Sequence, residues 1–295
     1  MNNIQTEKFV HPAKARIQII ISALILLGNL SIPINAQDRD NLRIMSFNLR
    51  YGTVEDGENS WRFRKENVVA VIKESKPDLI GFQEALNFQN EELLKMMPEY
   101  SCAGAGRDDG RSAGEFSSVF YRKDRIEVDT IKTFWFSDTP EIPGSKNWGN
   151  NITRICTWIH ARDKLTGESF YHFNLHLDHE SQYSRERSAL LVIKKIQEKK
   201  EPVILTGDFN CGEENNAIKS ILSGGMKDCY RLRNSKRENE GTFNSFKGET
   251  GGDRIDFVFI SDGLDAEKSE IIRRNFEGKY PSDHFPVTAV IGFRK

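Results

Sequence analysis

The sequence predicts an α+β domain in which β-sheets are covered by helices. Three observations predict this fold class. Short apolar segments of strand length recur from Leu42 onward, segments with helical periodicity lie between them, and no Pro-, Gly- or Ser-rich linker or low-complexity segment interrupts the alternation. We therefore predict one continuous domain over residues 37–295.

Eight segments are expected to be strands and two are expected to be helices. The strands are 42–48, 78–83, 117–122, 154–161, 169–177, 202–208, 254–260 and 285–291. The first helix, 61–74, follows Ser60 as a candidate N-cap, and the second, 183–199, carries apolar residues at i, i+3, i+4 and i+7 from Ala189 to Ile196. Segments 44–48 and 205–210 both end in polar residues, which is compatible with a duplicated two-sheet layout.

The first 36 residues have the layout of a secretory signal peptide. Lys14 and Arg16 precede the apolar stretch 19–27, and no further charged residue occurs before Asp38. This stretch is shorter than the about 20 apolar residues that span a bilayer. We expect cleavage after Ala36, export to the periplasm, outer surface or medium, and no stable membrane span in the mature chain; a retained N-terminal anchor is the alternative.

Composition excludes several classes of protein. With 38% hydrophobic and 29% charged residues, the chain is neither collagen-like, coiled-coil nor disordered. The 42 basic and 43 acidic side chains create no global positive field that would hold nucleic acid by charge alone. The four cysteines contain no C-x-x-C pair, which excludes a zinc ribbon or redox motif and leaves disulfides open.

Polar side chains gather where the predicted strands end. A single aspartate after a strand is usually a turn or helix-capping residue. A repeated pattern, flanked each time by apolar strand residues, favours one shared pocket instead. The residues are Asn48, Glu84, Asn174, His176, Asp178, Asp208, Asn210, Asp256, Asp283 and His284.

The carboxylates in this set predict a bound cation. Two like charges 4 Å apart cost about 4 kcal/mol at an effective dielectric of 20, so converging carboxylates need a positive charge among them. Oxygen and amide ligands without a thiolate cluster favour Mg²⁺, with Mn²⁺ or Ca²⁺ as alternatives, over structural zinc. Because Mg²⁺ leaves coordination positions to water and phosphate oxygens, a phosphate ester is the expected substrate.

Six short motifs follow one another along the chain: SFN at 46–48, GFQE at 81–84, NLHLD at 174–178, TGDFN at 206–210, RID at 254–256 and SDH at 282–284. These motifs and their order resemble the endonuclease/exonuclease/phosphatase superfamily of metal-dependent phosphoesterases, in an exported bacterial-type member. The resemblance implies a four-layer sandwich, with two mixed, mostly antiparallel β-sheets packed face to face and flanked by helices. It also implies Mg²⁺-dependent hydrolysis by in-line attack of water on phosphorus.

For the metal and the general acid or base, the resemblance implies five roles. Glu84 is the expected principal metal ligand, Asn48 its neighbour in direct or water-mediated contact, and Asp283 a further metal or supporting ligand. His284 is the expected catalytic histidine, and Asp256 is the carboxylate that fixes its tautomer.

For the substrate, the resemblance implies that Asp208 orients the attacking water or protonates the leaving oxygen. Asn210 and His176 are expected to donate to phosphate oxygens, and Asn174 is expected to brace the substrate-binding pocket. Arg50 stands where some nucleases carry an acidic residue that assists the metal, which argues against a second tightly held ion.

Two loops have competing interpretations. In the glycine-rich loop at 104–110, Arg107 is expected to bind substrate phosphate with Glu115 holding it, or else to pair with Asp108 or Asp109 in a surface turn. The aromatic residues at 134–136 and Trp148 are either core or a stacking surface for substrate, and core is favoured.

The substrate is left open among nucleic acid, phospholipid, nucleotide and sugar phosphate, and so is the choice between diester and monoester. A monomer is expected. The alternative function is a catalytically silent phosphate- or lipid-headgroup-binding module on the same scaffold. A glycoside hydrolase with paired carboxylates would leave Asp256 and His284 without a role.

Overall fold

The computed structural model describes Met1 and residues 40–294, which contain two six-stranded sheets. The first sheet consists of β1 (Leu42–Asn48), β2 (Leu79–Gln83), β3 (Tyr100–Ala103), β4 (Val119–Arg122), β11 (Leu264–Ile271) and β12 (Val287–Phe293). The second consists of β5 (Ile126–Trp135), β6 (Ile155–Asp163), β7 (Ser169–His176), β8 (Val203–Asp208), β9 (Lys227–Asp228) and β10 (Asp256–Ile260). The expected signal peptide at 1–36 lies, apart from Met1, outside the described residues and stays a prediction.

Each sheet contains one parallel pair of strands, and its other neighbours are antiparallel. The strand orders are β11-β12-β1-β2-β4-β3 and β5-β6-β7-β8-β10-β9. The parallel pairs are β1–β2 and β7–β8. The predicted fold class, with two mixed and mostly antiparallel sheets, is confirmed.

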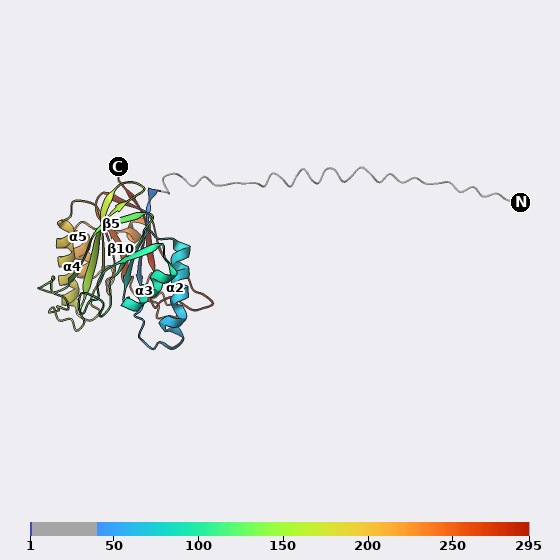
Figure 1. The fold of residues 1–295 in the computed structure, drawn as a ribbon, viewed down its shortest axis with the longest axis horizontal. Coiled ribbons are helices and arrows are strands. Elements are labelled where there is room, and N and C mark those ends of the chain that lie inside the picture. Colours follow the sequence, from blue (N-terminus) through green and yellow to red (C-terminus); the bar gives the residue numbers. More distant parts are fainter. Residues whose placement is uncertain (2–39, 295) are drawn as a thin grey trace. The chain divides into compact units, whose positions relative to one another are not determined.

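Helices cover the outer faces of the two sheets (Figure 1). The helix α2 (Trp61–Ser75), preceded by the 3-10 turn η1 (Gly57–Asn59), lies with α3 (Asn87–Met96) on the first sheet, where Ile72 and Leu93 pack among Phe47 and Phe82. The helices α4 (Gln182–Gln197) and α5 (Asn216–Ser223) cover the second sheet, and the short α6 (Cys229–Arg233) follows β9. No helix in residues 40–294 has the length and apolar character needed to cross a membrane.

The inner faces of the two sheets change from apolar to polar along the strands. Residues two apart on a strand share a face, so Ile44, Ser46 and Asn48 all point inward from β1. On β8 the corresponding series begins at Ile204 and ends at Asp208. The interior is therefore an apolar core at one end of the strands and a polar layer at the other.

The four strands that the sequence prediction missed are the four edge strands. β3, β5, β9 and β11 each pair with one neighbour, whereas the eight predicted segments correspond to the eight inner strands. Edge strands carry charged and exposed side chains, which protect an unpaired edge and also weaken the apolar pattern. In β5, for example, the exposed residues Glu127 and Asp129 alternate with the partly buried residues Val128 and Thr130.

The two predicted helices begin close to their expected positions, with one correction. Ser60 precedes α2, but its hydroxyl makes no capping hydrogen bond and is buried without a partner among residues 40–294. For α4 the cap is Ser181, whose Oγ accepts a hydrogen bond from Ser184 N at 3.1 Å. Of the two helices that the sequence predicted, α4 therefore has a side-chain N-cap and α2 does not.

Gly81 allows the two sheets to approach at the polar end of the interior. An added Cβ would lie 2.1 Å from Thr206 Oγ1 and 2.4 Å from Asn174 Oδ1. That Asn174 oxygen accepts hydrogen bonds from Gln83 Nε2 at 2.7 Å and from Thr206 Oγ1 at 3.0 Å. A side chain at position 81 would therefore break a buried hydrogen-bond network.

We expect Gly81→Ala to lower the free energy of unfolding by about 2–4 kcal/mol, because it combines overpacking with lost buried hydrogen bonds. Thermal unfolding followed by circular dichroism measures this. Gly251→Ala is the matched control, because an added Cβ there meets no atom within 4 Å. Equal melting temperatures for the two variants would contradict the close approach at Gly81.

Candidate active site

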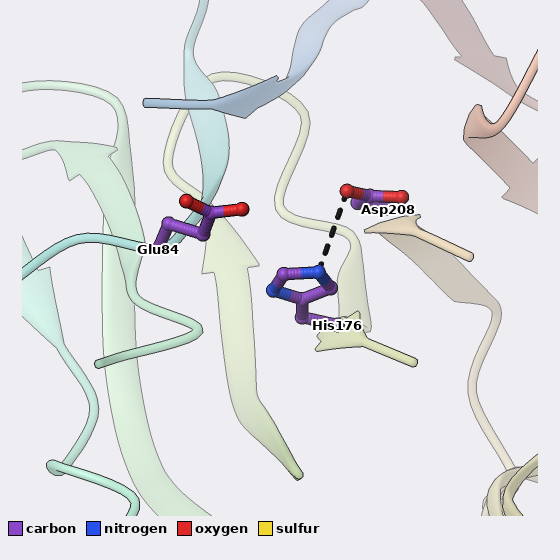
Figure 2. Close-up of side chains that lie close together, drawn as sticks. All are labelled: Glu84, His176 and Asp208. Atoms are coloured by element: carbon purple, nitrogen blue, oxygen red, sulfur yellow. Dashed lines mark ion pairs between the residues drawn. The ribbon is translucent and has the colours of Figure 1, made fainter. Parts of the chain in front are cut away.

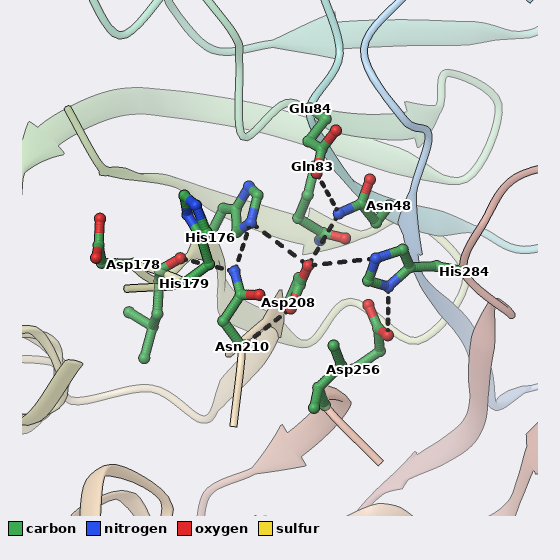
Figure 3. A network of polar contacts seen from close by, with 12 residues as sticks. Asn48, Gln83, Glu84, His176, Asp178, His179, Asp208, Asn210, Asp256 and His284 are labelled. Carbon is green, nitrogen blue, oxygen red and sulfur yellow. Dashed lines mark hydrogen bonds and ion pairs between the residues drawn. The ribbon is translucent and has the colours of Figure 1, made fainter. Parts of the chain in front are cut away.

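Strand register brings the predicted polar residues together at one edge of the two sheets. Asp208 is aligned with His176 on β7 and with Asp256 on β10, so three ionisable side chains stand side by side in the second sheet. In the first sheet Asn48 is aligned with Gln83, next to Glu84. Figure 3 shows Asn48 joining the sheets, with its Nδ2 donating to Asp208 Oδ2 at 2.9 Å.

Three residues at this edge have left-handed backbone conformations that side chains rarely adopt. Their φ angles are 56° at Arg50, 60° at Glu84 and 50° at Asn210. Each follows shortly after a strand end and lines one pocket. Such conformations cost about 1–3 kcal/mol each and cluster at functional sites, so the turns that aim these side chains are held by the surrounding structure.

His284 is oriented by the predicted partner Asp256. The Asp256 Oδ2 accepts a hydrogen bond from His284 Nδ1 at 2.9 Å, which leaves Nε2 facing Asp208 Oδ2 at 3.8 Å. Burial lowers the pKa of His284, but the neighbouring Asp256 and Asp208 carboxylates outweigh it and hold the pKa well above its usual value. The His284 imidazole is therefore protonated, and positively charged, at neutral pH.

Asp208 is the centre of the polar network. Its Oδ2 also lies 3.4 Å from His176 Nε2, and its Oδ1 accepts from Asn210 N at 2.9 Å. Burial, followed by the nearby Asp256 charge, raises the pKa of Asp208 to about 7, although His284 lowers it. A carboxyl group with a pKa near neutrality is suited to both accepting and donating a proton.

Glu84 and Asp283 supply further carboxylate oxygens to the pocket. Glu84 Oε1 accepts from Asn48 Nδ2 at 3.0 Å, and its Oε2 accepts from Tyr51 N at 3.1 Å. Asp283 Oδ2 lies 3.8 Å from Arg50 Nε. Burial raises the pKa of Asp283 despite the opposing effect of His284.

These donors fit a hard divalent cation. Figure 2 shows Glu84, His176 and Asp208 pointing toward one another, and each has a potential ligand atom within 4.8 Å of the others. The raised pKa values of Asp208 and Asp283 indicate that this buried cluster is short of positive charge. Carboxylate oxygens are the preferred ligands of Mg²⁺.

His176 and Asn210 act as a unit. Asn210 Nδ2 donates to His176 Nε2 at 2.9 Å and to Leu177 O at 3.0 Å, so both amide hydrogens have acceptors within the protein. Burial, followed by the charges of Arg154 and Arg107, holds the pKa of His176 well below its usual value. The neutral ring therefore carries its proton on Nδ1. His176 keeps a donor for a ligand, whereas Asn210 orients it.

Besides Asp256, two expected site residues, Asn174 and Asn48, lie behind the pocket rather than in its lining. Asn174 is fully buried, and its Nδ2 donates to Phe82 O at 2.8 Å and Ser118 O at 3.0 Å. This geometry fits the expected role of bracing the substrate-binding pocket. Asn48 is also fully buried, and its Oδ1 accepts from Arg50 N at 2.9 Å. Its Nδ2 holds the Glu84 carboxylate, and Asn48 is not among the residues that line the pocket.

The pocket has a volume of about 470 Å³ and includes residues that sequence reasoning did not assign to the site. Arg154 and His179 are joined by a 2.8 Å hydrogen bond from Nη2 to Nδ1, and Phe243 packs its ring edge-on against His284. The aromatic residues at 134–136 and Trp148 are buried core, as favoured. The lining residues are Arg50, Tyr51, Glu84, Arg107, Glu115, Ile152, Arg154, His176, His179, Asp208, Asn210, Phe243, Ile255, Asp283 and His284.

Comparison with known proteins gives one family. The model of the Endonuclease/Exonuclease/phosphatase family matches residues 45–284. An uncharacterized protein of Acanthamoeba polyphaga mimivirus is 28% identical over 163 residues, which are 52% of this chain and 60% of that relative. The chain thus matches less than two thirds of the relative's length.

Solved structures from Bacteroides have the same fold over most of the chain. An endonuclease/exonuclease/phosphatase of Bacteroides vulgatus is 36% identical with a TM-score of 0.82, covering 86% of this chain and 99% of its own. A mannosyl-6-phosphatase of Bacteroides thetaiotaomicron is 34% identical with a TM-score of 0.80, covering 85% of this chain and 100% of its own.

Proposed function

The chain belongs to the endonuclease/exonuclease/phosphatase family, and we propose that it is a Mg²⁺-dependent hydrolase of phosphate esters. The observation that carries this proposal is the presence of the Asp256–His284 pair, Asp208 and Glu84 around one pocket. A structural histidine would not need a second carboxyl group, here Asp208 with a pKa of about 7, facing its Nε2 at 3.8 Å.

Glu84 is the proposed principal ligand of the cation, with Asp283 on the same pocket wall and Asn48 fixing the Glu84 carboxylate. A bound divalent cation would neutralise charge on the phosphate oxygens during attack. Arg50 is held by Asp56 through Nε at 3.0 Å and contributes a fixed positive charge beside Asp283. This arrangement supports a single ion.

The chain's own residues position the water and move the protons. Asp256 keeps the His284 Nδ1 proton in place, so the Nε2 side of the charged ring faces Asp208 and the pocket. Asp208 is placed to orient a water molecule and to exchange a proton with it. His176 donates from Nδ1 to a phosphate oxygen, and burial of the whole set strengthens each of these interactions.

A substrate panel tests the proposed function. We expect the purified protein with Mg²⁺ to hydrolyse a phosphomonoester faster than other esters, and the mannosyl-6-phosphatase relative supports a hexose 6-phosphate as the first substrate. The panel also contains phenyl phosphate, a diaryl phosphodiester, RNA, plasmid DNA and sphingomyelin. Release of phosphate or of the alcohol is measured. Binding of these esters without turnover, in Mg²⁺ or Mn²⁺, would favour the silent binding module instead.

A further inference from the structure

Resting on the proposed function, we propose that Arg107, Glu115 and Arg154 recognise the hydroxyl groups of a sugar leaving group. The three side chains line the pocket that contains Glu84 and His284. Their exposed fractions are 15%, 14% and 4%, respectively. Charged groups are seldom buried this far unless they are paired or contact a ligand.

The loop that carries Arg107 and Glu115 is fixed in place. Arg107 N donates to Glu115 O at 3.1 Å, and Trp135 Nε1 donates to Arg107 O at 2.6 Å. Phe116 N donates to Ala85 O at 2.7 Å, so Glu115 is held beside the segment that carries the proposed metal ligand. Arg107 Nε also lies 3.9 Å from Asp108 Oδ1, so the expected pairing with a sequence neighbour is present beside the closer contact with Glu115 at 2.7 Å. The backbone hydrogen bonds make this loop a fixed wall of the pocket.

The wall offers donors and an acceptor side by side. Arg107 Nη1 donates to Glu115 Oε2 at 2.7 Å, and within residues 40–294 this is the one hydrogen bond of the Glu115 carboxylate. The Arg154 guanidinium likewise makes one hydrogen bond in this part of the chain, to His179. The remaining N–H groups and carboxylate oxygen match a hydroxyl group, which donates and accepts at once.

The charges at this wall favour hydroxyl groups over a second phosphate. Arg107 is paired with Glu115, and Arg154 Nε lies 3.6 Å from Asp178 Oδ2, so each cation already faces a carboxylate. A phosphate group placed here would also be repelled by Glu115. Neutral hydroxyl groups gain the hydrogen bonds without that repulsion.

An exposed aromatic ring in the same pocket supports a sugar. Phe243 lines the pocket and is 46% exposed, although its ring packs edge-on against His284 at 5.2 Å between centroids. Apolar surface left open in a pocket is commonly covered by a ligand. The C–H face of a hexose would cover the ring while its hydroxyl groups reach the arginines.

The test compares hexose 6-phosphate with phenyl phosphate, which has no hydroxyl groups on its leaving group. We expect Glu115→Gln and Arg154→Lys each to lower kcat/KM for hexose 6-phosphate about tenfold or more beyond any change for phenyl phosphate, because hydrogen bonds to charged groups are lost. Arg111→Ala is the matched control, since Arg111 is exposed on the same loop and does not line the pocket. The control should keep the wild-type ratio of kcat/KM for hexose 6-phosphate to kcat/KM for phenyl phosphate.

A binding measurement separates this inference from the proposed function. Titration calorimetry with Mg²⁺, carried out in a slow His284→Gln background so that the ester is not hydrolysed during the titration, should show weaker binding of hexose 6-phosphate when Glu115→Gln is added. The binding of inorganic phosphate should change little. Equal losses of kcat/KM for hexose 6-phosphate and phenyl phosphate would assign the residues to phosphate binding and overturn the inference. Equal weakening of the binding of hexose 6-phosphate and of inorganic phosphate would do the same. So would a wild-type protein that binds hexose 6-phosphate no better than phenyl phosphate. Binding with this selectivity but without turnover would contradict only the proposed function.

Discussion

Replacing His284 with glutamine should lower kcat about 10³-fold while the protein stays folded. The charged His284 imidazole faces Asp208 Oδ2 with its Nε2, and its Nδ1 donates to Asp256 Oδ2 at 2.9 Å. A positioned general acid or base contributes about 10²–10⁴-fold. Glutamine is preferred over alanine because its amide can still donate to the buried Asp256, whose Oδ1 has no hydrogen-bond partner in the described part of the chain. Steady-state kinetics on the best substrate of the panel measures the loss.

Two further variants give this prediction its control. Asp256→Asn should also be slow, and the double variant should be no slower than His284→Gln, because residues that act as a unit are not additive. His160→Gln removes a histidine that pairs with Asp129 outside the pocket, and its kcat should equal that of wild type. A folded His284→Gln protein within tenfold of wild type would show that the pair has no part in the reaction.

The sequence was most informative wherever the alternation of side chains decides the structure. Inner strands have two neighbours and apolar faces, so all eight were predicted, whereas charges on edge strands such as β5 and β11 hid their pattern. The same alternation of side chains predicts part of the site, because Asp208 and His176 end their strands facing inward. Their alignment follows from the parallel pairing of β7 with β8. No local signal, however, indicates which strands become neighbours.

Arg154 shows why part of the pocket could not be predicted. It directly precedes β6, which runs antiparallel to β7, so the start of β6 lies at the same edge as the end of β7. Asp256 at the start of β10 is placed by the same rule. Arg154 contacts His179 across the pocket, and this contact depends on loops whose paths no sequence period specifies.

Removing divalent cations should abolish activity, and adding Mg²⁺ back should restore it together with thermal stability. Without the cation, Glu84 and Asp283 face each other's charge, and burial already raises the pKa of Asp283. An ion that binds only the folded state stabilises it by about 2.7 kcal/mol at 100 times its Kd. For a domain of this size that corresponds to about 5–10 °C in Tm. Thermal unfolding with EDTA and with saturating Mg²⁺ measures the shift.

Glu84→Gln identifies the ligand behind that shift. Glutamine keeps the shape of the side chain but removes the charge that holds the cation, so both the Tm shift and the activity should fall to near those of the EDTA-treated protein. The control is Glu66→Gln, since Glu66 is exposed on α2 and outside the pocket, and it should respond to Mg²⁺ like wild type. Each Glu84 oxygen accepts a hydrogen bond, from Asn48 Nδ2 or from Tyr51 N, and glutamine keeps only one of the two acceptors. The Mg²⁺ shift of the variant is therefore measured against the melting temperature of the same variant in EDTA. If Mg²⁺ raised the Tm of Glu84→Gln as much as that of wild type, Glu84 would not be the ligand. The ion would then be assigned to the cluster of Asp208, Asp256 and His284, whose ligand atoms also lie within 4.8 Å of one another.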